Sequence, residues 1–579
     1  MISIPFSNCY RTFMQTLRRR KKTLVIVLFR PFQVPFMVDY FHMKAYTLFT
    51  LLMLLIGFLR YLKALKTTKQ IYTWQKQVLP MCLKHMENNF IPIFIKFLEL
   101  RSKELVRGGH MVLTFLGRSN ADPTTDDGCF PMKLLAQSLL CMVKEGLVEE
   151  SYVNSFNIPH YTPCEDEVRN AIYSEGSFSL DIFGGFQEPL LISHFGNSLD
   201  IENKGKGKIA MEVENILHMN VGNGESSYAS NSFLQETVIR ETLQVLKQSI
   251  KGMVNLDVAF NKSFVLADLG CGTGTNTLLL ASMVIDTVLE LCKEHDRKAP
   301  HFQVCLNDLL GNDFNTIFQL LPNFYGNLKK KGENFGSCFV SAIPGSFYGR
   351  LFQDESLHLV HASYSVHWLS QVPQGIENNK ANIYMAKTSP PNVFEAYGKQ
   401  FHTDFIKFLQ LRSKELVHGG RMVLTFLGRS SVDPTTDDCC RAFDLLARSL
   451  LCMVKEGLVE ESYVNSFNIP IYTPCEDEVR YAIHNEGSFS LDTFNDFQGN
   501  WDPYDTDYTN TVDSDTESHI HGKNYAKVLR AVMEPLLVSH FKSSINIDVL
   551  FRIFQEQVAK DLANKKTRRY NIVISLTKR

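Results

Sequence analysis

The feature that most constrains this chain is a long internal repeat, because any fold must accommodate one segment twice. Residues 94–187 match residues 405–498 at a constant offset of 311, with 76 of the 94 positions identical. Both copies contain RSKELV, MVLTFLGRS, DPTTDD and CMVKEGLVEESYVNSFNIP. A solenoid stacks several adjacent units, which two copies this far apart cannot do. We therefore interpret residues 91–203 as a truncated duplicate of region 405–545, fused in front of a complete domain at 211–579.

The segments around the first copy predict an extension and a linker. Residues 204–210 contain KGKGK, a glycine-rich run typical of a flexible junction. Residues 1–90 include an uncharged stretch at 45–59 that is 15 residues long. A helix of that length spans about 22 Å, short of the roughly 30 Å hydrocarbon core. We expect a poorly ordered extension at 1–90, with a membrane anchor at 45–59 as the less favoured alternative.

The first copy is expected to be inactive, because it begins downstream of the glycine-rich loop described below. It also lacks most strands of the sheet that its twin would join, so its apolar faces have no evident partner. We therefore expect it to remain disordered.

Composition excludes several classes of protein. Hydrophobic residues make up 45% and charged residues 21%, which is ordinary for a globular chain. Lys and Arg total 60 against 61 Asp and Glu, so no net field favours nucleic acid as a partner. The 13 cysteines are scattered without a C-x-x-C pair, which favours reduced thiols and a cytoplasmic location. The expected ligand is a small molecule.

A strand, a glycine-rich turn and a helix carry the chemistry. Residues 264–268 (FVLAD) predict a buried parallel strand, followed by LGCGTGTN at 269–276 and an apolar helical pattern. This unit is half of a nucleotide-binding α/β fold, and its glycines let the backbone approach a ligand closely. The acid Asp268 ends the strand where a cationic ligand would lie. The form DLGCGTG is typical of S-adenosylmethionine (SAM) sites, with a purely structural turn as the alternative.

A second strand is predicted at 302–306, and it is followed by Asp308. An acid at the carboxyl end of such a strand can accept hydrogen bonds from ribose hydroxyls. A helix N-cap is the alternative role for this residue.

From Met211 onward the chain resembles the SABATH family of plant methyltransferases, which methylate carboxyl groups of salicylate, benzoate or jasmonate. A branch of that family methylates ring nitrogens. The resemblance is carried by LHMNVGNGESSYASNS, NDLLGNDFN, PGSFYGRLF, SYSVHWLSQVP, GGRMVLTFLGR and MEPLLVSHF. It implies an α/β fold, a Rossmann-like seven-stranded SAM-dependent methyltransferase sheet with a helical cap over the acceptor. It also implies a homodimer.

The resemblance places the SAM contacts on nine residues. They are Tyr228, Ser232, Asp268, Cys271, Asn276, Asp308, Leu309, Ser346 and Phe347. The family's loop usually reads CSSGPNT, whereas residues 271–277 here read CGTGTNT. Cys271, Gly274 and Asn276 are kept, so we expect SAM binding to survive with a looser turn.

The resemblance places the acceptor pocket on a second set of residues. They are Gln235, Tyr364, His367, Trp368 and Phe443, with a variable position at Ala442. The Gln235 amide and the Trp368 indole can each donate a hydrogen bond to a carboxylate. A carboxylic acid is already ionised at neutral pH, so we predict no catalytic acid or base.

The family also implies a divalent-metal site, where Mg²⁺ would be the ion. It maps to Asn379, Asn465, Phe467 and Asn468, with Phe467 offering only its carbonyl. The family usually has Asp where this chain has Asn465, so a charge is lost, and hard cations prefer charged oxygen ligands. The alternative is that Asn465 simply satisfies a loop.

Together these features predict transfer of a methyl group from SAM to a small carboxylic acid. Phe443 stands where salicylate-type members commonly have Trp, and His367 can donate to an acceptor oxygen. Both favour a compact aromatic acid, salicylate or benzoate, over the longer jasmonate. An N-methyltransferase on a purine or pyridine acceptor, and a non-catalytic product of gene fusion, remain the alternatives.

Overall fold

The computed structural model describes the chain in two compact units, Met1–Lys204 and Gly205–Arg579. The described residues are 23–30, 80–118, 121, 139, 142–143, 146–155, 161–187, 217–222, 224–253, 263–331, 337–376, 379, 381–509 and 514–579. The stretch at 45–59 and the linker at 204–210 lie outside them. Among the described residues, no helix combines the length and apolar character needed to cross a membrane.

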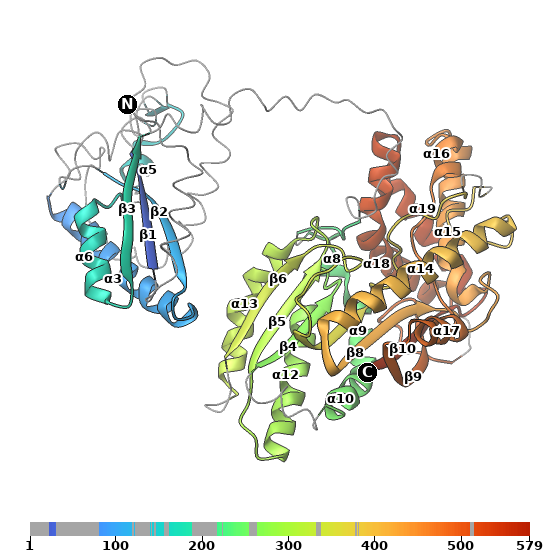
Figure 1. Cartoon of the computed structure of the whole chain (residues 1–579). Helices are drawn as coiled ribbons and strands as arrows, with labels where there is room; N and C mark the ends of the chain where they lie inside the picture. The colour runs from blue at the N-terminus through green and yellow to red at the C-terminus, as the bar shows by residue number, and fades with distance from the viewer. Residues whose placement is uncertain are drawn as a thin grey trace, which may run out of the picture. The chain divides into compact units, whose positions relative to one another are not determined.

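The larger unit is built on a seven-stranded sheet with strand order β6-β5-β4-β7-β8-β10-β9 (Figure 1). The strands are β4 (Ser263–Leu269), β5 (His301–Asp308), β6 (Cys338–Pro344), β7 (Leu357–Ser363), β8 (Leu416–Gly428), β9 (Phe489–Asn500) and β10 (Arg568–Lys578). The first five are parallel, and β10 runs antiparallel between β8 and β9. The α/β fold with a seven-stranded sheet is confirmed, and the strands predicted at 264–268 and 302–306 are β4 and β5.

Successive side chains of a strand point to opposite faces, so this sheet has two cores. On β8, Val423 packs in one apolar cluster while Met422 and Leu424 pack in the other. The first cluster is completed by α9 (Phe233–Glu241), α10 (Leu243–Lys251), α12 (Asn276–Glu294) and α13 (Phe314–Lys329). The second is completed by α14 (Pro391–Glu415), α15 (Asp437–Lys455), α16 (Glu461–Ser466), α17 (Glu476–Glu486), α18 (Asp515–Phe541) and α19 (Ile547–Leu562). In Figure 1, α15, α16, α18 and α19 gather at the end of the unit away from α12 and α13.

A buried ion pair near the end of α14 holds the loop after β6. The Arg412 Nε and Glu415 Oε2 atoms are 2.7 Å apart, and neither side chain is exposed. The Arg412 guanidinium donates to the carbonyls of Phe347 and Gly349, while Glu415 accepts from the backbone N–H of Leu351 and Phe352. Both buried charges are therefore surrounded by hydrogen-bond partners, and the loop that carries Ser346 and Phe347 is tied to the helix.

The smaller unit contains a three-stranded sheet of order β2-β1-β3. Its elements are β1 (Thr23–Arg30), α3 (Pro80–Glu104), β2 (His110–Leu116), α5 (Glu150–Ser155), α6 (Glu165–Glu175) and β3 (Ser179–Gln187). Strand β1 is parallel to both of its neighbours. In the larger unit the counterparts of β2 and β3 are β8 and β9, and the strand between them is the antiparallel β10.

Our expectation that the apolar faces of the first copy have no partner was wrong for the described residues. The β-branched and apolar run TLVIVLFR supplies the missing middle strand as β1. Phe94 and Leu98 of α3 pack against Val168 and Ile172 of α6 in a small core. The first copy therefore has local packing of its own.

We predict that Glu415→Ala destabilises the larger unit by about 3–5 kcal/mol, because it leaves Arg412 buried without a counter-charge. Urea unfolding followed by tryptophan fluorescence would measure the change. The matched control is Glu476→Ala, which breaks the Glu476–Arg480 pair whose side chains are about half exposed. That variant should lose at most about 1 kcal/mol, and equal losses in the two variants would contradict the role given to the buried pair.

Candidate active site

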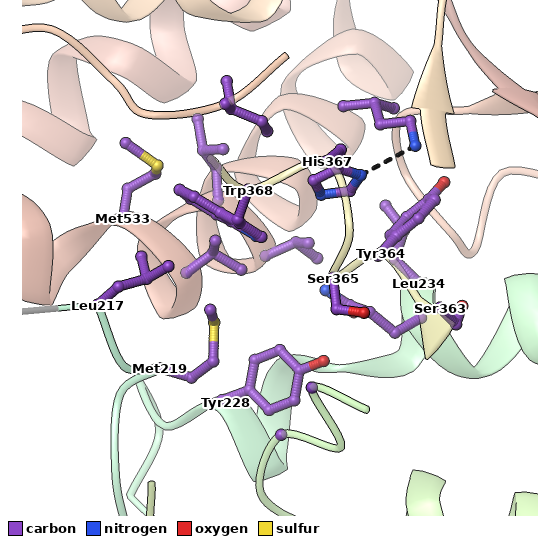
Figure 2. A pocket seen from close by; sticks show the side chains of 18 of the residues that line it. Leu217, Met219, Tyr228, Leu234, Ser363, Tyr364, Ser365, His367, Trp368 and Met533 are labelled. Atoms are coloured by element: carbon purple, nitrogen blue, oxygen red, sulfur yellow. Dashed lines mark hydrogen bonds between the residues drawn. The ribbon is translucent and has the colours of Figure 1, made fainter. Parts of the chain in front are cut away.

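A large cavity lies at the carboxyl ends of β4, β5 and β7, with a volume of about 1490 Å³ including its open mouth (Figure 2). At one end it is lined by the predicted SAM contacts Tyr228, Asp308, Leu309, Ser346 and Phe347. The predicted acceptor residues Gln235, Tyr364, His367, Trp368 and Phe443 also line it, together with Ala442. The structure therefore brings segments from most of the larger unit's length into a single cavity.

The glycine-rich turn after β4 needs its glycines for both conformation and space. Gly270, Gly272 and Gly274 have φ values of +70°, +63° and +120°. A Cβ atom on Gly270 would lie 2.3 Å from the Cβ of Ser365, and one on Gly272 would lie 2.8 Å from the Tyr228 ring. No larger residue fits at Gly270 or Gly272 without moving these neighbours. The backbone of the turn therefore lies close to the cavity without side chains at these positions.

Asp308 is fixed at the end of β5 by two backbone donors. The N–H groups of Gly272 and Leu309 donate to its two carboxylate oxygens, each at 2.8 Å. Burial raises the pKa of Asp308 to about 6, and the two backbone donors limit that rise. Each carboxylate oxygen keeps a further lone pair, so the group can accept from hydroxyls of a ligand in the cavity.

Four other predicted SAM contacts do not line the cavity. They are Ser232, Asp268, Cys271 and Asn276, all of which are buried. Asn276 donates to the Ser232 carbonyl at 2.9 Å. Asp268 accepts from Thr277 at 2.7 Å and lies 2.9 Å from His361 Nδ1. These hydrogen bonds hold Asp268 and Asn276 in place at the two ends of the turn.

The hydrogen bonding of His367 determines which of its two ring nitrogens carries the proton. The backbone N–H of Leu427 donates to His367 Nδ1 at 3.0 Å, drawn as the dashed line in Figure 2. Burial lowers the pKa of His367 to about 3, so the ring is neutral at physiological pH. Since Nδ1 accepts, the ring proton is on Nε2. The Nε2–H of His367 can therefore donate a hydrogen bond, and the ring is a poor base.

Two more acceptor residues have features that suit a polar ligand. Gln235 has a buried side-chain oxygen with no hydrogen-bond partner among the described residues. Tyr364 has φ of +56°, a left-handed conformation that is strained for a bulky residue. Its hydroxyl donates to Asn571, and its backbone N–H donates to Thr425. The ring is therefore held beside the cavity by contacts to two strands.

Part of the cavity lining was not predicted from the sequence. It consists of His218, Trp501, Tyr525, Val528, Leu529, Val532, Met533 and Arg569, among others. Most of these residues come from α18 and the start of β10, and Trp501 follows directly after β9. Val528, Leu529 and Val532 lie on α18 at a spacing that sequence alone assigns to any core helix. Figure 2 shows Met533 near Trp368, with Leu217 below Met533 in this view.

The residues predicted to bind a divalent cation are not arranged to coordinate one. The Asn379 amide donates to Asn468 Oδ1 and accepts from the Ser389 hydroxyl, so both oxygens already have protein partners. Asn465 adds no charge, and Phe467 is buried. Nor do the described residues contain a group of three or more His, Cys, Asp or Glu side chains able to hold a metal. No step below depends on Mg²⁺.

Comparison with known proteins agrees with this geometry. A family model described as SAM dependent carboxyl methyltransferase matches residues 63–207 and 214–579. The chain belongs to this family. SAM is its methyl donor, and the glycine turn, Asp308 and the adjoining cavity fit that ligand.

Three relatives illustrate the similarity. A benzoic acid/salicylic acid carboxyl methyltransferase 3 of Petunia hybrida is 48% identical over 370 residues, which cover 64% of this chain and 99% of the relative. The jasmonate O-methyltransferase of Arabidopsis thaliana is 42% identical over 389 residues, covering 64% and 100%. The solved structure of loganic acid methyltransferase with SAH is 29% identical, with a TM-score of 0.54, and covers 62% of this chain and 98% of its own.

We predict that Asp308→Ala weakens SAM binding by about ten- to a hundredfold. Loss of a charged hydrogen-bond partner costs about 1.5–3 kcal/mol, and each 1.4 kcal/mol is a factor of ten. Titration calorimetry would measure the dissociation constant. Asp286→Ala is the control, because Asp286 pairs with Lys331 on the surface of α12 and should leave SAM affinity unchanged. Unchanged affinity in Asp308→Ala would remove Asp308 from the SAM site.

We also predict a pH dependence of SAM binding. The ionised carboxylate of Asp308 is the better acceptor for hydroxyls, and its pKa of about 6 means that it protonates as the pH falls below that value. Affinity should be full above pH 7 and about tenfold weaker at pH 5. Asp308→Asn should bind weakly with a flat profile between pH 5 and 8. A wild-type profile that is equally flat would show that another group controls binding.

Proposed function

We propose that this chain transfers the methyl group of SAM to the carboxylate of a compact aromatic acid, of the salicylate or benzoate kind. The observation that carries the proposal is the neutral His367, which lines the cavity with Gln235 and Trp368 and has its Nε2–H available to donate. Donors of this kind suit an acceptor that is already negatively charged.

The side chains of the acceptor pocket contribute orientation and no proton transfer. The acid is ionised at pH 7, and His367, with a pKa of about 3, holds no role as a base. When bound, SAM supplies an electrophilic methyl group on its sulfonium. Gln235, His367 and Trp368 would hold one carboxylate oxygen in line with that methyl. Such orientation is worth up to about 7–11 kcal/mol in favourable cases.

The walls of the pocket favour a compact, flat acid. Phe443 packs edge-on against Tyr384 with ring centroids 5.0 Å apart, and Tyr384 in turn packs against Tyr397 at 5.3 Å. Val528, Leu529 and Val532 of α18 add apolar surface. Aromatic and branched side chains of this kind bind a ring and exclude water. The preference over the jasmonate chain is modest, because one methylene changes binding by only about 1–3 kcal/mol.

We further propose that the protein works as a homodimer in the cytoplasm. The family resemblance supports the dimer. The free thiols of the described cysteines, including Cys271 and Cys305, support a reducing compartment.

The test is methyl transfer from labelled SAM to benzoate, salicylate, jasmonate and xanthine. We expect methyl esters of benzoate or salicylate, with kcat/KM above that for jasmonate. A tenfold advantage for jasmonate would overturn the pocket assignment and leave the reaction class intact. Methylated xanthine would indicate N-methyl transfer, and SAM binding without any product would indicate a non-catalytic chain.

A further inference from the structure

The acceptor end of the cavity contains a buried arginine that no part of the mechanism above uses. Arg569 is the second residue of β10, is 7% exposed and lines the cavity. Its Nη1 atom is buried without a hydrogen-bond partner. No Asp or Glu of the described residues forms an ion pair with it. Among the described residues that line the cavity it is the sole Lys or Arg.

The guanidinium is held in place by a chain of hydrogen bonds. Arg569 Nε donates to the Tyr364 hydroxyl at 3.2 Å, and that hydroxyl donates to Asn571. The Asn571 amide donates to the Phe497 carbonyl at 3.0 Å. Asn571 is fully buried. The side chain of Arg569 is thus oriented by two strands, β9 and β10, while Nη1 remains free.

A glycine on the neighbouring strand makes room for this side chain. Gly499 of β9 pairs with Arg569 in the sheet register. A Cβ atom at Gly499 would lie 2.6 Å from Arg569 Nη2 and 2.7 Å from Cζ. Gly499 has no positive φ value, so space and not backbone conformation requires glycine here. Any larger residue would displace the guanidinium.

A buried charge without a counter-ion is unfavourable, and the protein around Arg569 does not supply one. Tyr364 and Tyr525 lie near it, and burial raises the pKa of both phenols, so both remain neutral. An anion entering the cavity would therefore gain a charge-assisted hydrogen bond and relieve the isolated charge.

We propose that Arg569 is the anion-recognising residue of the acceptor pocket, with Nη1–H donating to an anionic oxygen of the acid. This inference rests on the proposed function and names the property that the acceptor must have. The oxygen belongs either to the carboxylate that is methylated or to a second anionic substituent on the same acid. In both cases Arg569 selects ionised acids over neutral molecules of the same shape.

The experiment compares benzoate with benzamide, which has nearly the same shape and no charge. Binding of each to the full chain in the presence of S-adenosylhomocysteine is measured by calorimetry. If Arg569 binds the reacting carboxylate, the wild-type chain should prefer benzoate, and Arg569→Met should reduce benzoate affinity about ten- to a hundredfold. Benzamide affinity should change less than threefold, and Arg569→Lys should recover part of the preference for benzoate.

The matched control is Arg568→Met on the adjacent residue. Arg568 bonds to Asn500 and Thr509 and does not line the cavity, so this variant should retain the preference. Gly499→Ala tests the same point without removing the charge, because the added methyl group displaces the Arg569 guanidinium. This variant should lower the affinity for benzoate and leave the affinity for benzamide unchanged. S-adenosylhomocysteine affinity, measured for every variant, reports whether the fold is intact.

A second arm separates the two sources of the oxygen by using terephthalate, which carries a second carboxylate. An equal loss for benzoate and terephthalate in Arg569→Met assigns the residue to the reacting carboxylate, whereas a loss for terephthalate alone assigns it to the second substituent. Equal losses for benzoate and benzamide, or no loss for either acid, would overturn the proposal. If the wild-type chain binds S-adenosylhomocysteine but no acid, the proposed function itself fails.

Discussion

The contact between Gly270 and Ser365 joins the two functional halves of the larger unit. A side chain at Gly270 would lie 2.3 Å from the Ser365 Cβ, and the Ser365 hydroxyl donates to the Leu269 carbonyl at 2.8 Å. Ser365 stands directly beside Tyr364 and two residues before His367, so this contact sets the spacing between the turn and the acceptor side chains. Methyl transfer depends on that spacing, because the reacting atoms must approach within about 3–3.5 Å in line.

The cavity is polar at a few points and apolar elsewhere, and several of the polar side chains are held by hydrogen bonds to the protein. Asp308 accepts from two N–H groups, His367 accepts from Leu427, and Tyr364 is tied to Asn571. Polar groups fixed in this way need not reorganise when charge moves, which is the main electrostatic contribution a site of this kind can make. Arg569 extends the same arrangement to the charge of the acceptor.

The duplicated segment shows how one sequence behaves in two surroundings. Local features are reproduced in both copies: α6 and α17 have Cys164 and Cys475 as their N-cap residues, and a left-handed glycine follows each helix. Burial is not reproduced. The side chains of the Arg101–Glu104 pair are 36% and 57% exposed, whereas the equivalent Arg412–Glu415 pair is fully buried because a loop of the complete domain covers it. Caps depend on neighbouring residues, but the environment of a charge depends on distant ones.

The sequence by itself determined the strands β4 and β5, the turn between β4 and α12, and, through its motifs, the family and much of the cavity. These follow from periodicity, glycine and acid positions that lie within a few residues of one another. Only the tertiary structure decided that Asp268, Asn276 and Ser232 lie outside the cavity lining and that the Asn379 amide donates to Asn468. It alone brought Arg569, 205 residues after Tyr364, to the acceptor side chains. Pairing of β10 with β8, which lies next to β7, made that contact, and nothing local to the residues RRY signals which strand they will face.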